Sequence, residues 1–118
     1  MNTAQIHIGD SLEQVGNRFI DAWHRIERGE IQGAEIHVGF ESWESMVHTL
    51  SPKRLELLRH IHRNPAKNIR TLAVALGRDY RRVHEDVETL GTAGLLERDK
   101  KGVRTGYDAF TVAMKIAL

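Results

Sequence analysis

The sequence contains no cysteine among its 118 residues. This absence excludes a disulfide scaffold, a thiolate nucleophile, an iron–sulfur cluster and every zinc site that needs thiolate ligands. The sequence also lacks an apolar run of the roughly 20 residues that span a bilayer. Residues 1–10 show no signal-peptide pattern. We therefore expect a cytoplasmic protein that has no membrane partner.

Recognisable catalytic motifs are absent as well. There is no glycine-rich phosphate loop and no nucleophile–base pair. Seven histidines are present, but His60 and His62 lie two positions apart in a predicted helix, so they point in different directions and cannot chelate one metal ion. We predict that the protein is not an enzyme and that it has no cofactor, catalytic site or metal site. A metal-sensing repressor that uses histidines and carboxylates stays an alternative.

Charge is nearly balanced over the whole chain but is unevenly distributed along it. The 17 Lys and Arg residues exceed the 16 Asp and Glu residues by one. Residues 1–50 carry 3 cations and 8 anions, a net charge of −5, so residues 51–118 carry 14 cations and 8 anions, a net charge of +6. A basic half is typical of nucleic-acid-binding regions, and the asymmetry indicates that the two halves meet different partners.

Residues 1–49 show the pattern of a strand, a long helix and a second strand. Apolar and polar residues alternate over residues 4–8 and 36–40, which predicts the two strands. A short helix is predicted over residues 42–50. The long helix is predicted over residues 11–28 by an apolar stripe of Leu12, Val15, Phe19, Ala22, Trp23 and Ile26.

The two strands of this region would pair in parallel, as in a crossover unit. A two-stranded sheet alone is marginally stable in water. We therefore expect the region to pair with the rest of the chain, a second copy or another protein. Residues 1–49 are predicted to be a dimerisation or partner-binding region.

Residues 50–118 show the order of three helices followed by a β-hairpin and a terminal strand. Ser51 and Pro52 are a strong helix start, and Gly77 lies in the short connection between the second and third helices. Such a connection is typical of a helix-turn-helix. The helices are predicted over residues 52–63, 69–76 and 79–93, the hairpin over 95–98 and 103–107, and the last strand over 110–118.

This order predicts an α+β fold class. We expect a winged helix-turn-helix DNA-binding domain over residues 50–118, in which the hairpin is the wing, with the strand-helix-strand region as an N-terminal extension. In a helix-turn-helix, the N-terminal part of the last helix enters the major groove of DNA.

A helical wheel divides the predicted helix 79–93 into two faces. Val83, Val87, Leu90 and Tyr80 form the buried arc. The exposed arc near the helix start holds Arg78, Arg81 and Arg82, whose planar guanidinium groups suit a guanine edge or a phosphate. The alternative is a solvated helix face. The predicted DNA-binding residues are Arg70, Thr71, Arg78, Tyr80, Arg81, Arg82, His84, Lys100, Lys101 and Arg104.

Five stretches of this sequence resemble MarR-like winged-helix transcriptional regulators of bacteria and archaea, small proteins that are often suspected antitoxins. These stretches are Gly39–Glu44, Leu50–Leu58, Ile69–Ala73, Leu76–Val87 and Gly94–Arg98. The resemblance implies DNA binding, with the reading helix over 79–89 and its contact region at Arg78, Tyr80, Arg81, Arg82 and His84. It also implies binding at the protein's own promoter.

Two functions follow as hypotheses. The first is a sequence-specific transcriptional regulator, an autorepressor that binds double-stranded DNA as a homodimer at an inverted repeat. The second is an antitoxin whose acidic N-terminal half neutralises a cognate toxin protein, with DNA binding secondary.

Overall fold

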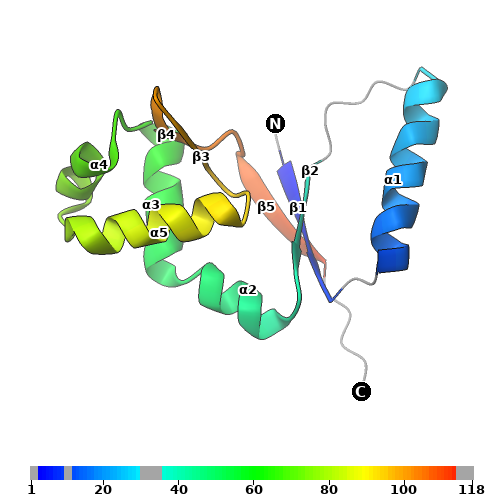
Figure 1. Ribbon diagram of the computed structural model, residues 1–118, viewed down its shortest axis with the longest axis horizontal. Coiled ribbons are helices and arrows are strands. Elements are labelled where there is room, and N and C mark those ends of the chain that lie inside the picture. Colours follow the sequence, from blue (N-terminus) through cyan, green and yellow to red (C-terminus); the bar gives the residue numbers. More distant parts are fainter. Residues whose placement is uncertain (1–2, 10–11, 30–35, 114–118) are drawn as a thin grey trace.

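The computed structural model describes residues 3–9, 12–29 and 36–113, and this part of the chain is an α+β fold with five helices and two small sheets. Figure 1 shows one sheet in the middle of the molecule, with four helices and a hairpin on one side of it and a single long helix on the other. The elements are β1 (Thr3–Ile8), α1 (Leu12–Glu27), β2 (Ile36–Phe40), α2 (Trp43–Thr49), α3 (Pro52–Arg63), α4 (Ile69–Leu76), α5 (Tyr80–Thr92), β3 (Glu97–Asp99), β4 (Gly102–Arg104) and β5 (Ala109–Ala113).

The larger sheet has the strand order β2-β1-β5, and both strand pairs are parallel. The predicted parallel pairing of the first two strands is therefore confirmed. Because side chains alternate between the faces of a strand, Ala4, Ile6 and Val38 share the face that packs against the helices, and all three are buried. Phe110 is level with Ala4 and packs against the same core.

The third strand explains how this sheet becomes stable. The sequence grouped the terminal strand with residues 50–118, but β5 pairs along β1, from Thr3 opposite Ala109 to His7 opposite Ala113. The rest of the chain thus supplies the partner that a two-stranded sheet needs. Residues 114–118 of the predicted terminal strand lie outside the described residues.

The two crossovers of this sheet lie on opposite faces. The chain moves from β1 to β2 in one direction, and then from β2 past β1 to β5 in the other direction. Parallel crossovers are right-handed, so opposite directions place their connections on opposite faces. Accordingly, α2 to α5 lie on one side of the sheet and α1 on the other (Figure 1).

Side-chain caps fix the starts of α3, α4 and α5 where the sequence predicts them. The Ser51 hydroxyl accepts a hydrogen bond from the Arg54 N–H, and the Asn68 side chain accepts one from the Thr71 N–H at 2.8 Å. Asp79 caps α5 in the same way, by accepting from the Arg82 N–H. Each cap satisfies an amide that the first helical turn leaves without a partner.

Gly77 ends α4 in the left-handed conformation, with φ of 64°. This conformation is accessible to glycine at little cost, and it turns the chain so sharply that Asp79 already begins the next helix. The two helices are therefore joined by a connection of only three residues. Their inner faces meet α3 in one core, whose fully buried large side chains include Leu57, Ile61, Leu72, Val83, Leu90, Leu95 and Val103.

A charged network ties the helices together beside this core. Asp86, on the inner side of α5, accepts hydrogen bonds from Arg54 at 3.0 Å and from Arg78 at 2.7 Å. Arg54 also donates to the carbonyl oxygen of His48 at the end of α2. Only 12% of the Asp86 side chain is exposed. Such a network holds helices in one arrangement, because each of its charged groups loses its partner if the helices move.

The hairpin of β3 and β4 is anchored to the α3–α4 connection. Ala66 and Val103 exchange two backbone hydrogen bonds, of 3.0 and 2.8 Å. Gly102 has a φ of 131°, and a Cβ at this position would collide with the carbonyl oxygen of Ala66. The paired part of the hairpin is shorter than predicted, since β4 ends at Arg104. The side chain of Thr105 then bonds the carbonyl oxygen of Leu95.

Candidate nucleic-acid interface

The start of α4, the start of α5 and the tip of the hairpin surround one hollow in the surface. Its volume is about 390 Å³. Lys67, Arg70, Tyr80 and Lys100 line it, one or two from each of these three elements. The caps at Asn68 and Asp79 start the two helices here, so local sequence signals determine which side chains border the hollow.

Five of the predicted cations are exposed at the start of α4, the start of α5 and the hairpin tip, and we call them the cationic surface. Within the described part of the chain, none of their side chains forms an ion pair. A cation without a protein partner keeps its charge available for an anionic ligand. The cationic surface consists of Arg70, Arg81, Arg82, Lys100 and Lys101.

Tyr80 connects two of the elements on this surface. The guanidinium of Arg70 lies over its ring at 5.8 Å, and the ring of His84 lies 5.9 Å from it on the next turn of α5. The Tyr80 side chain is 47% exposed, so the prediction that it belongs to the buried arc is wrong. As the first residue of α5, Tyr80 lies beyond the reach of the core and stacks with Arg70 and His84 instead.

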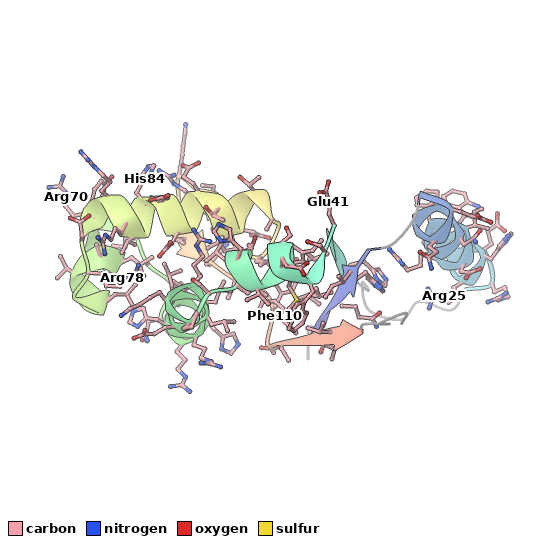
Figure 2. All side chains as sticks on the ribbon, turned by 90° about the horizontal axis from the view of Figure 1, so that it is seen from below. Arg25, Glu41, Arg70, Arg78, His84 and Phe110 are labelled. Atoms are coloured by element: carbon pink, nitrogen blue, oxygen red, sulfur yellow. The ribbon has the colours of Figure 1, made fainter. Side chains whose placement is uncertain are left out.

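Arg78 does not lie with the exposed cations, so the prediction that it shares the exposed arc of the helix is wrong. Its side chain is 17% exposed, and its guanidinium binds Asp86. Figure 2 shows Arg70 and His84 at the outer side of α5, whereas Arg78 is on the side toward α3. The helical wheel extended α5 back over Arg78, but the helix begins after Asp79, so Arg78 lies in the turn and follows a different direction.

Arg104 is less available to a ligand than a cation on a free hairpin tip would be, because its guanidinium forms two ion pairs. It binds Asp99 at 2.7 Å and Glu97 at 3.1 Å. The hydrogen bond from Arg104, followed by that from the Lys101 N–H, holds the pKa of Asp99 well below its ordinary value. In turn, Asp99 raises the pKa of Arg104. Arg104 therefore stabilises the hairpin tip and leaves Lys100 and Lys101 to extend from it.

The remaining predicted residues lie close to the hollow. Thr71 is exposed on the first turn of α4, and its backbone N–H is already bonded to Asn68. His84 is partly exposed, with Nε2 3.9 Å from a carboxylate oxygen of Glu88. Of the ten predicted positions, Arg70, Tyr80 and Lys100 line the hollow and His84 lies against the Tyr80 ring, whereas Arg78 is bonded to Asp86.

Sequence reasoning overlooked two cations at this hollow. Lys67 is exposed and lines it directly before the Asn68 cap. Arg98 also lines it, but its guanidinium binds Glu88 at 2.6 Å. The position of Lys67 one residue before a helix cap was an available signal, because side chains at that position flank the amide groups of the first turn.

The surface has the features of an anion-binding site. It combines mobile ammonium groups, planar guanidinium groups and an aromatic ring, which together suit phosphates and base edges. Among the described residues, no group of three or more histidine or acidic side chains could hold a metal ion. In the same residues, every helix is too short or too polar to span a bilayer.

Comparison with known proteins places the helical part of the chain in a family. The family model HVO_A0114 matches residues 49–112, which is more than half of the chain. The chain belongs to the HVO_A0114 family. No curated protein and no solved structure matches it.

The HVO_A0114 match contains the whole cationic surface. It begins just before α3, includes α4, α5 and the hairpin, and ends within β5. The N-terminal β1, α1 and β2 precede the matched residues. The MarR-like resemblance and the antitoxin role stay predictions, as does the absence of enzymatic activity.

Proposed function

We propose that α3, α4, α5 and the hairpin form a winged helix-turn-helix of MarR-like type, and that this HVO_A0114 protein is a DNA-binding transcriptional regulator. The observation that carries the proposal is the cationic surface. Its unpaired guanidinium and ammonium groups lie at the start of α5, at the start of α4 and at the hairpin tip. These are the three places at which a winged helix touches duplex DNA.

Each group has a role in this proposal. Arg81 and Arg82 on the first turn of α5 enter the major groove, where arginine pairs with guanine O6 and N7 or binds a phosphate. Arg70, held over Tyr80, binds a backbone phosphate beside the groove. Lys100 and Lys101 reach the minor groove or the flanking phosphates.

The charged network around Asp86 supports this mode of DNA binding. Asp86 fixes α5 against α3 and against the turn after α4, so the exposed first turn of α5 is held rigidly. A rigid reading helix loses little conformational entropy when it binds. As a transcriptional autorepressor with twofold symmetry, the protein would bind an inverted repeat whose half-sites lie one or two helical turns apart.

The test is the double variant Arg81→Ala with Arg82→Ala. We expect it to lose at least about 100-fold in affinity for duplexes selected from random DNA by the native chain, because each guanidinium–base contact contributes about 1–3 kcal/mol. Fluorescence anisotropy measures the affinity. The matched control is Arg28→Ala with Lys53→Ala, which removes the same charge from exposed positions outside the cationic surface. Equal loss in both variants, or native affinity in the double variant, contradicts the proposal.

A further inference from the structure

The apolar stripe of α1 is not covered by any of the residues that the structure describes. Phe19 is 70% exposed, Trp23 is 55% exposed and Ile26 is 65% exposed, and Ile20 beside them is 51% exposed. The indole N–H of Trp23 donates a 2.7 Å hydrogen bond to Glu27 on the next turn of the same helix. A contiguous apolar surface of this kind on a helix marks an interaction site.

The sheet cannot supply the missing cover. Its face on the α1 side is polar, since Gln5, His37 and Thr111 are exposed there in one row across the three strands. The apolar face of the sheet lies on the other side, under α2 and α3. To reach that side within its own chain, α1 would need a left-handed crossover, which parallel sheets almost never contain.

The opposite side of the same molecule has an unfilled apolar groove, which we call the α2–α3 groove. Its volume is about 730 Å³, and α2, α3 and β5 line it. Apolar side chains form its walls, among them Val47 and Val112, which are 47% and 46% exposed. The exposed cations Arg59 and Arg63 lie along it.

We propose that a second copy of this chain covers both surfaces, with α1 of each copy lying in the α2–α3 groove of the other. Each chain then donates one helix and accepts one, so the assembly closes as a symmetric dimer. Charge is complementary along one wall of the groove, because α3 contributes the exposed cations Arg59 and Arg63 to it. Glu13 and Glu27 border the apolar stripe of α1 and would face Arg59 or Arg63.

The area that is buried favours this exchange over a contact between two α1 helices. The four apolar side chains expose on the order of 500 Å² per helix, since a large aromatic side chain covers about 150–250 Å². Two helices in two grooves would bury roughly 2,000 Å², within the range of a stable interface. A contact between two α1 helices alone would bury roughly 1,000 Å², below that range.

Mass in solution tests whether the dimer forms. Light scattering of the full chain should give twice the 13.4 kDa of one chain at micromolar concentration. Phe19→Glu and Val47→Glu should each raise the dissociation constant by about 100-fold, because each removes an apolar contact twice from the symmetric dimer. Both positions are exposed in the single chain, so circular dichroism should stay native. Asn17→Glu on the opposite side of α1 is the matched control, and it should stay dimeric. A monomer at all concentrations overturns the proposal.

Cross-linking tests which surfaces meet. Because the native chain has no cysteine, Trp23→Cys and Val47→Cys each introduce a single thiol. A short bismaleimide should join an equimolar mixture of the two variants into a heterodimer, while Asn17→Cys mixed with Val47→Cys stays unlinked. If Trp23→Cys links only to itself, α1 pairs with α1 and the proposal is wrong. These experiments need no DNA, so they can contradict the proposed dimer while the proposed DNA binding holds. Likewise, the proposed DNA binding can be contradicted while the dimer forms.

Discussion

Arg78 and Arg81 are only three residues apart, yet they have different physical roles. Arg78 lies in the turn before α5, and its guanidinium is bonded to a carboxylate that is 12% exposed. Arg81 is exposed on the first turn of the helix and has no ion pair among the described residues. A paired and half-buried guanidinium stabilises the fold, whereas an exposed one is available to a ligand.

Removal of the central carboxylate shows the structural role directly. Asp86→Ala should lower the free energy of unfolding by about 3 kcal/mol, because it leaves Arg54 and Arg78 without their partner in a partly buried site. Urea denaturation measures this change. The adjacent exposed carboxylate gives a matched control, since Glu85→Ala should change stability by about 0.5 kcal/mol or less. Similar effects of the two variants would contradict the network.

Asp99 provides a prediction about pH at the hairpin tip. Its pKa lies well below the ordinary value of 3.8, first because of the hydrogen bond from Arg104. A carboxyl with a depressed pKa stabilises the fold above its unfolded pKa of about 3.9, and this contribution is lost as the pH falls toward the folded pKa. An NMR titration should therefore place the midpoint of Asp99 below 3.8. In Arg104→Ala the midpoint should rise toward that value, and an unchanged midpoint would be inconsistent with the pair.

At the scale of elements, short connections and backbone contacts set the positions of the helices and the hairpin. Gly77 allows α4 to end and α5 to begin within three residues. The two hydrogen bonds between Ala66 and Val103 hold the hairpin beside the start of α4. The hairpin tip thus reaches the cationic surface only because the α3–α4 connection fixes its base.

Gly102 tests this anchor. Gly102→Ala should cost about 2–4 kcal/mol in stability, since its Cβ would meet the backbone of Ala66 and its φ is unfavourable for other residues. Thermal or urea unfolding measures the cost. Gly106→Ala is the matched control, because a Cβ there meets no atom within 4 Å. A neutral Gly102→Ala variant would show that the hairpin base is not held in this way.

At the scale of the whole molecule, charge separates into an acidic half and a basic half. Residues 51–118 have a net charge of +6, and the five cations of the cationic surface lie on α4, α5 and the hairpin within this half. The acidic half carries α1, whose apolar stripe is exposed and which lies on the other side of the sheet from α2 to α5 (Figure 1). One end of the molecule therefore suits an anionic partner, and the other suits an apolar one.

The dependence of DNA affinity on salt concentration measures how many cations contact phosphates. If about five cations each neutralise a phosphate, the logarithm of the affinity for DNA should fall with the logarithm of the salt concentration with a slope of about −4.5 for each bound domain. Lys100→Ala with Lys101→Ala should make the slope smaller by about 2, because two phosphate contacts are lost. Anisotropy titrations at several salt concentrations measure both slopes. An unchanged slope in the variant would exclude the hairpin tip from the interface.

The order and bounds of the helices were predictable from local patterns. The predicted helices 52–63 and 69–76 match α3 and α4, and the prediction for 79–93 agrees with α5 to within a residue at each end. Caps such as Ser51 and Asn68 act on amides three residues away, and a helical stripe repeats within one or two turns. Such signals are contained in a few consecutive residues, so they can be detected from the sequence alone.

The location of the candidate interface was predictable from the sequence, but the role of every residue in it was not. The exposed positions Arg81 and Arg82 follow from the period of the helix, whereas Arg78 depends on where the helix begins and on a carboxylate eight residues further along the chain. Arg104 depends on partners across a hairpin. Ion pairs of this kind form between side chains that only folding brings together, so residue type and spacing do not reveal them.

Local pattern and charge distribution thus established the element order, the caps and the basic half of this protein. Three features depend on the tertiary structure: the pairing of β5 with β1, the ion pair of Arg78 with Asp86, and the position of α1 on the other side of the sheet from the hydrophobic core that the described residues form. The physical reason is the separation along the chain over which each kind of interaction acts. Periodicity and caps act over a few residues, whereas strand pairing, ion pairs and the burial of a helix face depend on which distant segments the crossovers bring together.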